Sequence, residues 1–184
     1  MIEAKLKQDV KYIWDMSFRE SIFSSFLGAL IAMSKLIRIP IHVPGHSGLI
    51  WIAILTFGCL IIRKRGSGTL MGLVAGFLAY VFGIGNEGPF VFFKYFLPGF
   101  SMDIIFRLIP AAAKKWYFVA ITAAFAHFTK LSVNYIMGTI LNVPQGYLLM
   151  GIQVAIINHA AFGFLGGMIA YIIYIKVSKF SIVK

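Results

Sequence analysis

Long apolar runs separated by short polar breaks fill the chain from residue 18 onward. A membrane-spanning helix needs about 20 predominantly apolar residues, and the pattern predicts six such helices. They cover roughly residues 18–37, 48–63, 68–86, 90–113, 116–140 and 146–175. The expected architecture is therefore an all-α integral membrane protein with one transmembrane domain over residues 1–184.

Two stretches depart from this simple pattern. Pro98-Gly99 interrupts the fourth run, which favours a short outer segment followed by the true span from about residue 98. Residues 1–16 carry apolar side chains at helical spacing with charged residues between them. That arrangement is typical of an amphipathic helix at the membrane interface, and equally of a cytosolic extension of the first span.

The composition agrees with a membrane protein. The chain is 60% hydrophobic and 12% charged, with a mean hydropathy of +0.88, whereas a soluble domain is about 45–50% apolar and about 25% charged. The net charge of +11 is explained better by the orientation bias of membrane proteins than by a nucleic-acid partner. Cys59 is the one cysteine, so a disulfide framework is excluded.

The basic residues predict the orientation. Twelve of the 17 lysines and arginines fall on one side if the chain has six spans, and the positive-inside rule then makes both termini cytoplasmic. The loops at residues 40–47, 86–89 and 142–146 would face outward. The twelve are Lys5, Lys7, Lys11, Arg19, Arg63, Lys64, Arg65, Lys114, Lys115, Lys176, Lys179 and Lys184.

Small residues recur at four-residue spacing in three of the runs, which lets helix backbones approach closely within a membrane. Internal packing accounts for most such ridges, but one can instead receive a separate membrane partner. The ridges are Gly68, Gly72 and Gly76, then Gly163 and Gly167, and in the first run Ser24, Gly28 and Ala32.

Polar side chains at membrane depth usually face the protein interior or a cavity. His127, Lys130 and Asn134 share one face of the fifth helix, which favours a cavity lining. In the fourth helix Asp103 and Arg107, four residues apart, are expected to form an ion pair. The last helix adds Gln153, Asn158 and His159.

Three functions are compatible with this polar set. The histidines His42, His46, His127 and His159, with Glu87, are suitable donors for Ni²⁺ or Co²⁺, although no HExxH motif or cysteine cluster supports a metal site. Gly45-His46-Ser47-Gly48 resembles the Gly-x-Ser-Gly of rhomboid intramembrane proteases, with Ser47 and His159 as a candidate dyad. The third function is transport, and because the chain has no GxxxxGK[ST] motif, nucleotide energy would have to come from other subunits.

The layout resembles the substrate-capture S component of an energy-coupling-factor (ECF) transporter. Lys94-Tyr95-Phe96-Leu97-Pro98-Gly99 leading to Asp103 is similar to the stretch before the fourth span of many such subunits. The ridge of Ser24, Gly28 and Ala32 is similar to the Ala-xxx-Ala face that they present to their coupling subunit.

The resemblance implies a non-enzymatic subunit in a prokaryotic cell membrane that binds a vitamin or a related organic micronutrient without a cofactor. A membrane coupling (T) subunit and two ATPase subunits would supply the energy. Metal-specific members begin with Met-His at an outward N-terminus, whereas Met1 is followed here by Ile2, which favours an organic ligand. The implied substrate-binding residues are His42, His46, Glu87, Lys94, His127, Lys130, Asn134, Gln153 and Asn158.

Overall fold

The computed structural model describes residues 16–34, 48–84, 88–149 and 151–179, and the regular structure in these ranges is helical. Six long helices are present in the described part of the chain, together with a short α7 and a short 3-10 helix, η1. They are α2 (Phe18–Ser34), α3 (Gly48–Ile62), α4 (Ser67–Val81), α5 (Phe90–Leu108), η1 (Pro110–Lys114), α6 (Trp116–Ile140), α7 (Gln145–Leu149) and α8 (Ile152–Lys179).

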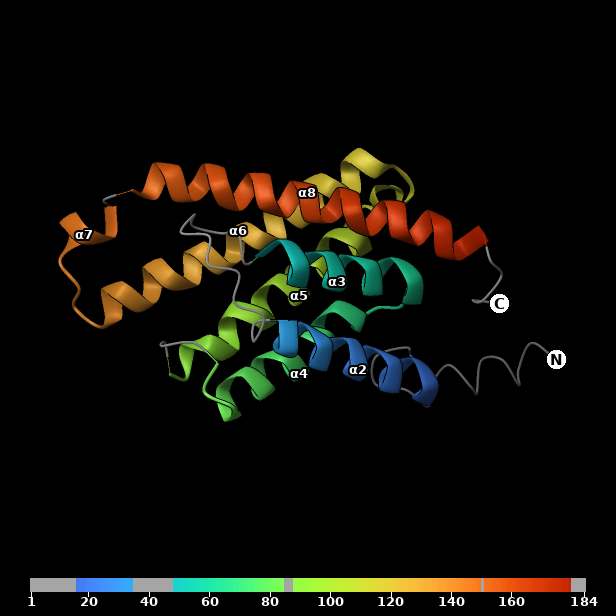
Figure 1. Ribbon diagram of the computed structural model, residues 1–184, viewed down its shortest axis with the longest axis horizontal. Helices are drawn as coiled ribbons and strands as arrows, with labels where there is room; N and C mark the ends of the chain where they lie inside the picture. Colours follow the sequence, from blue (N-terminus) through green and yellow to red (C-terminus); the bar gives the residue numbers. More distant parts are fainter. Residues whose placement is uncertain (1–15, 35–47, 85–87, 150, 180–184) are drawn as a thin grey trace.

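Consecutive long helices run in opposite directions, so that α2 begins and α8 ends at the same end of the bundle (Figure 1). The most extensive helix contacts join α6 to α8, α4 to α5, α3 to α8 and α2 to α4. The connections at residues 63–66 and 109–115 lie at this same end, which we call the basic end because Arg63, Lys64, Arg65, Lys114 and Lys115 are located there. The six predicted helices are thus confirmed as helices, and their orientation across a membrane stays a prediction.

Local sequence signals explain several helix boundaries. The Ser17 backbone N–H donates to Glu20 Oε2 at 2.7 Å, and the Glu20 N–H donates to Ser17 Oγ at 3.2 Å, which is a reciprocal capping box at the start of α2. Arg63 and Gly66 have positive φ angles of 52° and 85° in the turn between α3 and α4. Gly151, with φ at 76°, separates α7 from α8, where the sequence predicted one continuous helix.

The expected break at Pro98 is wrong. The helix α5 continues from Phe90 through Pro98 to Leu108. It ends earlier than predicted, because Pro110 starts the 3-10 helix that follows. A proline within a helix removes one backbone hydrogen bond without having to end the helix.

The glycines of α4 permit a very close approach to α5. A Cβ atom at Gly68, Gly72 or Gly76 would lie 2.7, 2.6 and 2.6 Å from the carbonyl oxygens of Gly99, Tyr95 and Phe92, respectively. In α8, a Cβ at Gly163 or Gly167 would lie 2.7 Å from the Cα of Ala124 or Ala120 on α6. Both ridges are therefore helix contacts inside the chain, as the sequence suggested.

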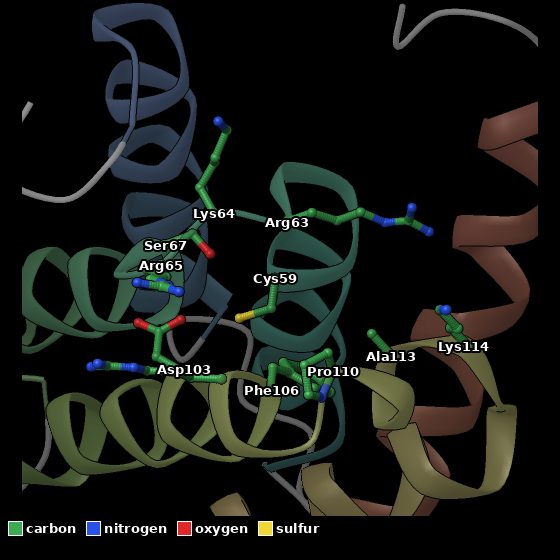
Figure 2. Close-up of a pocket in the computed structure, with 11 residues that line it drawn as sticks. Cys59, Arg63, Lys64, Arg65, Ser67, Asp103, Phe106, Pro110, Ala113 and Lys114 are labelled. Carbon is green, nitrogen blue, oxygen red and sulfur yellow. The ribbon is translucent and has the colours of Figure 1, made fainter. Parts of the chain in front are cut away.

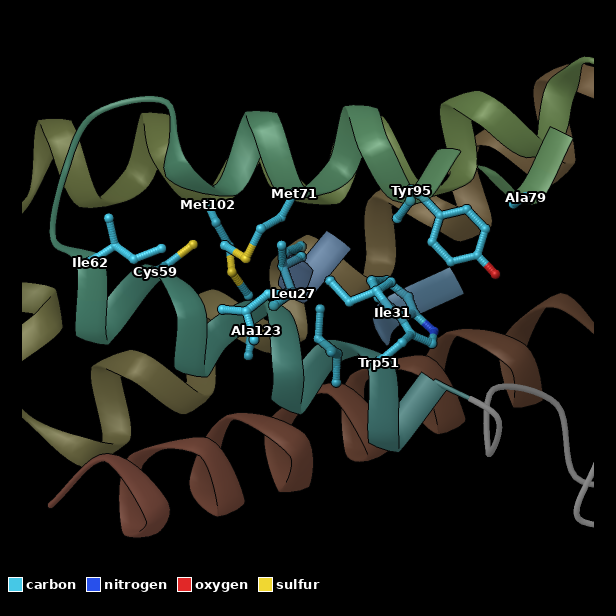
Figure 3. Packing of buried hydrophobic residues seen from close by; sticks show 14 of the residues in the cluster. Leu27, Ile31, Trp51, Cys59, Ile62, Met71, Ala79, Tyr95, Met102 and Ala123 are labelled. Atoms are coloured by element: carbon cyan, nitrogen blue, oxygen red, sulfur yellow. The ribbon is translucent and has the colours of Figure 1, made fainter. Parts of the chain in front are cut away.

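Buried aliphatic, methionine and aromatic side chains from α2, α3, α4 and α5 form most of the core (Figure 3). Large apolar side chains also cover much of the exterior, for example Phe18, Phe82, Leu108 and Ile157. Such extensive apolar exposure is unusual for a soluble monomer and typical of a surface that lipid covers. Among the described helices, α8 alone meets both the length and the hydropathy expected of a membrane span, while α3 and α4 are apolar but shorter.

Candidate functional site

Aromatic and polar side chains from α3, α5 and α6 meet toward the end of the bundle opposite the basic end. Trp51, in the first turn of α3, lies edge-to-face with Tyr95 of α5 at 5.7 Å and with His127 of α6 at 5.4 Å between ring centroids. The Lys130 ammonium lies 5.4 Å from the Trp51 ring centroid and 6.0 Å from that of Tyr95, in cation–π geometry. We call these four residues, together with His159, the aromatic–histidine cluster.

Two histidines, His127 and His159, are in contact within this cluster. His127 Nδ1 lies 2.8 Å from the carbonyl oxygen of His159 on α8. A carbonyl can only accept, so Nδ1 carries the proton in this bond. The two imidazole centroids are 4.4 Å apart, and both residues are buried. This contact fixes the plane of the His127 ring.

Gly48, the first residue of α3, packs directly against the His127 imidazole. A Cβ atom at Gly48 would overlap with Nε2 and Cε1 of the His127 imidazole, so only glycine allows the two to pack as they do. In the sequence, Gly48 stands out only as part of Gly-x-Ser-Gly and as the start of an apolar run. Its packing role depends on the fold, which brings residues 48 and 127 together.

Two buried polar atoms near this end have no hydrogen-bond partner in the described part of the chain. They are Nε1 of Trp51, whose residue is completely buried, and Oδ1 of Asn134. Asn134 lies four residues after Lys130 and therefore on the same face of α6. Buried polar atoms are nearly always paired with protein, water or ligand. A donor and an acceptor are thus available for a bound molecule.

The predicted site residues fall into three groups. His127 and Lys130 belong to the cluster, and Asn134 lies on the same face of α6. Lys94 precedes Tyr95 in α5 and is buried, with 4% of the lysine surface exposed. Gln153 is exposed and Asn158 half-buried on α8, and the described contacts join neither to the cluster. His42, His46 and Glu87 lie outside the described residues, as do Ser47 and the segment 1–15.

The small-residue ridge of α2 is an internal contact. Ser24, Gly28 and Ala32 are buried, and a Cβ at Gly28 would lie 2.7 Å from the carbonyl oxygen of Met71 and 2.9 Å from Cβ of Val74 on α4. In this structure the three residues therefore pack inside the chain, and their role as a partner interface stays a prediction. The exposed side of α2 carries Phe18, Ile22, Phe26 and Met33 instead.

Asp103 also has another role than expected. Its carboxylate accepts hydrogen bonds from the backbone N–H of Gly68 at 3.0 Å and from the N–H and Oγ1 of Thr69, both at 2.6 Å. Within the described ranges, no ion pair joins it to Arg107. The predicted ion pair is thus replaced by a cap that α5 supplies to the N-terminus of α4, where the helix dipole favours negative charge.

Two comparisons with known proteins identify the fold and the family of this chain. A solved structure described as "Crystal structure of an S-component of ECF transporter" superimposes with a TM-score of 0.63 at 13% sequence identity, covering 91% of this chain and 88% of that one. The fold is therefore that of an ECF S component, a class of membrane proteins, which confirms the resemblance in architecture. Residues 21–129 match the family described as "ABC-type cobalt transport system, permease component", and the chain belongs to that family. No curated protein matches.

Proposed function

We propose that this protein is the substrate-binding subunit of an ECF-type uptake transporter and that it binds a small organic micronutrient in the aromatic–histidine cluster. The observation that carries this proposal is the meeting of Trp51, Tyr95, His127 and Lys130, with the indole N–H of Trp51 lacking an acceptor among the described residues. Ligand pockets combine apolar and aromatic walls with a few well-placed polar groups. A planar ring bearing nitrogen or oxygen acceptors suits this set.

The experiment that tests this proposal is native mass spectrometry of the purified protein, released from mild detergent, to detect a small molecule that co-purifies with it. A compound retained by the wild type and lost in a Trp51→Ala/His127→Ala variant supports the site. The matched control is Trp116→Ala/Phe118→Ala, which changes exposed aromatic residues in the first turn of α6, at the basic end. Equal retention in both double variants would place the ligand elsewhere.

Transition-metal uptake is the second candidate function, because the matching family is described as a cobalt transport permease. His127 and His159 supply two imidazoles whose centroids are 4.4 Å apart. Within the described ranges no group of three or more His, Cys, Asp or Glu side chains is placed to hold a metal ion. Titration calorimetry with Co²⁺ and Ni²⁺ on metal-free protein separates the two candidates, because tight binding lost in His159→Ala would favour the metal.

The partners follow from the same proposal. The chain contains no nucleotide-binding motif of the GxxxxGK[ST] type. A membrane coupling subunit and two ATPase subunits would therefore supply the energy for uptake. The exposed apolar side of α2 is available to such a coupling subunit, whereas Ser24, Gly28 and Ala32 are buried in the isolated chain.

A further inference from the structure

A cleft lies at the basic end, far along the helices from the aromatic–histidine cluster. It is a cleft of about 310 Å³ between the α3–α4 turn, the last turns of α5 and η1 (Figure 2). Cys59, Phe106, Pro110 and Ala113 contribute apolar parts of its wall. Nothing in the proposed uptake function uses this cleft.

Positive charge dominates the cleft. Arg63, Lys64, Arg65, Arg107 and Lys114 all line it, and Asp103 is the one carboxylate among its eleven lining residues, all of them described. Both Asp103 oxygens already accept hydrogen bonds from the N-terminus of α4. The cleft is thus lined by five basic residues and a single carboxylate, both oxygens of which already accept hydrogen bonds. The side chains of Arg63 and Lys64 extend away from Asp103 (Figure 2).

The helix α8 holds both walls of the cleft in place. Tyr171 Oη donates a hydrogen bond to the Lys114 carbonyl oxygen at 3.0 Å. Tyr174 is hydrogen-bonded to the Arg63 guanidinium, which also lies 5.2 Å from its ring centroid. The walls thus come from chain segments that are tied to a third helix, which pre-organises the cleft for a ligand.

An apolar strip leads from the helical body to this cleft. Phe100, Ile104 and Leu108 are exposed and recur every four residues, so they form one row along α5. Arg107, which lines the cleft, is adjacent to the last of them. A ligand that fits both features would have a charged head group in the cleft and hydrocarbon chains along this row, as an amphiphilic molecule does.

We propose that the cleft binds the phosphate group of an anionic phospholipid, with its acyl chains along the Phe100, Ile104 and Leu108 row. Basic pockets between helices at a membrane surface bind lipid head groups through this chemistry, and arginine suits phosphate because of its planar, multiply donating guanidinium. The proposal depends on the membrane location of the protein and not on the identity of its substrate. The proposal gives the basic residues of the cleft a ligand, in addition to their predicted role in setting the orientation of the protein across the membrane.

The experiment compares four proteins in detergent with an equimolar mixture of phosphatidylglycerol and phosphatidylcholine, and native mass spectrometry counts the lipid retained. They are the wild type, Arg65→Gln/Arg107→Gln, Ala113→Phe, and Lys176→Gln/Lys179→Gln. The third fills the cleft and keeps every charge, and the fourth removes two charges from the last turn of α8, outside the cleft. A second arm titrates delipidated protein with inorganic phosphate and tripolyphosphate by calorimetry.

We expect the wild type to retain one phosphatidylglycerol in preference to phosphatidylcholine. Removing a basic side chain from the cleft should weaken retention roughly fivefold, hence roughly 25-fold for Arg65→Gln/Arg107→Gln. Ala113→Phe should abolish the preference, and Lys176→Gln/Lys179→Gln should leave it within about twofold of wild type, since these residues are outside the cleft.

Three results would overturn the proposal. One is an equal loss in the two charge variants with Ala113→Phe unaffected, because the attraction would then be spread over the surface. Another is no lipid preference together with no phosphate binding. The third is saturable phosphate binding that is lost in the cleft variants without any lipid preference, which would assign the cleft to a soluble phosphate compound instead of a lipid.

Discussion

His127 is held between the first residue of α3 and the backbone of α8, so single atoms decide the geometry of the candidate site. The carbonyl oxygen of His159 fixes one ring nitrogen at 2.8 Å, and the missing side chain of Gly48 leaves room for the other. Trp51 follows three residues later on the same helix and shares the contact with His127. Substitutions at these positions should therefore alter ligand binding more than their size suggests.

Gly48→Ala is the most direct test of this geometry. The added Cβ overlaps with the imidazole of His127 and must displace it, so we expect ligand binding to weaken by at least roughly tenfold and the free energy of unfolding to fall by about 1–3 kcal/mol. Gly146→Ala is the control, because a Cβ there meets nothing within 4 Å. Calorimetry and thermal unfolding measure both effects. Equal behaviour of the two variants would show that His127 does not depend on Gly48.

Trp51→Phe isolates the indole N–H. The change keeps an aromatic ring in the core but removes the donor that has no acceptor among the described residues. If this donor binds the substrate, affinity should fall by about ten- to a hundredfold, since an unmet hydrogen bond costs about 1–3 kcal/mol. Trp116→Phe, at an exposed position, serves as the control. Unchanged affinity in Trp51→Phe would mean that the substrate uses other groups.

At the scale of helices, the sequence predicted which elements exist better than how they contact one another. The apolar runs located all six long helices, and glycine spacing correctly indicated close packing of α4 and α8. The same kind of spacing in α2 left internal packing and a partner surface both open, because a one-dimensional pattern does not distinguish a buried ridge from an exposed one. Pro98 suggested a break, but a helix packed against its neighbours can tolerate one missing hydrogen bond.

The candidate site was only partly predictable for a related reason. The spacing of His127, Lys130 and Asn134 placed them on one helix face, which depends on local geometry alone. The contacts of Trp51 with Tyr95 and His127, and that of Gly48 with His127, join residues far apart in the chain. No local periodicity encodes such pairs.

Asp103 connects α5 to α4, and its replacement tests that connection. Asp103→Ala leaves the N–H groups of Gly68 and Thr69 without their acceptor, so we expect a loss of about 1–3 kcal/mol in the free energy of unfolding. Asp103→Asn keeps one acceptor oxygen and should lose less. Thermal unfolding in detergent gives the order of stability.

Arg107→Gln is the matched comparison for this prediction. Because Arg107 is exposed and makes no ion pair with Asp103 in the described structure, its replacement should change the free energy of unfolding by less than about 0.5 kcal/mol. A loss of unfolding free energy as large as that of Asp103→Ala would instead support the Asp103–Arg107 ion pair that the four-residue spacing predicts.

For the whole molecule, the alternating helix directions bring the described basic connections to one end. The positive-inside rule then predicts that this end is cytoplasmic and that the aromatic–histidine cluster lies toward the outside. In a Cys59→Ser background, an impermeant thiol reagent added to intact cells should label Gln145→Cys and not Lys64→Cys. Labelling of Lys64→Cys alone would invert the orientation and move the proposed substrate site to the cytoplasmic side.

Assembly with a coupling subunit should depend on the exposed side of α2 and not on its small-residue ridge. Gly28 is buried against α4, whereas Ser25 is half-buried and lies beside the exposed Ile22 and Phe26. Gly28→Leu should therefore destabilise the isolated protein by about 1–3 kcal/mol through overpacking. Ser25→Leu should leave stability within about 0.5 kcal/mol of wild type but reduce co-purification with the coupling subunit.

Co-purification and thermal unfolding, measured on the same preparations of Gly28→Leu and Ser25→Leu, separate these two effects, because a surface change weakens assembly without loosening the fold. The opposite outcome would be a stable Gly28→Leu that loses its partner, together with a Ser25→Leu that keeps it. Since Gly28 is packed against Met71 and Val74, the buried ridge would then have to become exposed on docking. In that case α2 would have to separate from α4 in the assembled transporter.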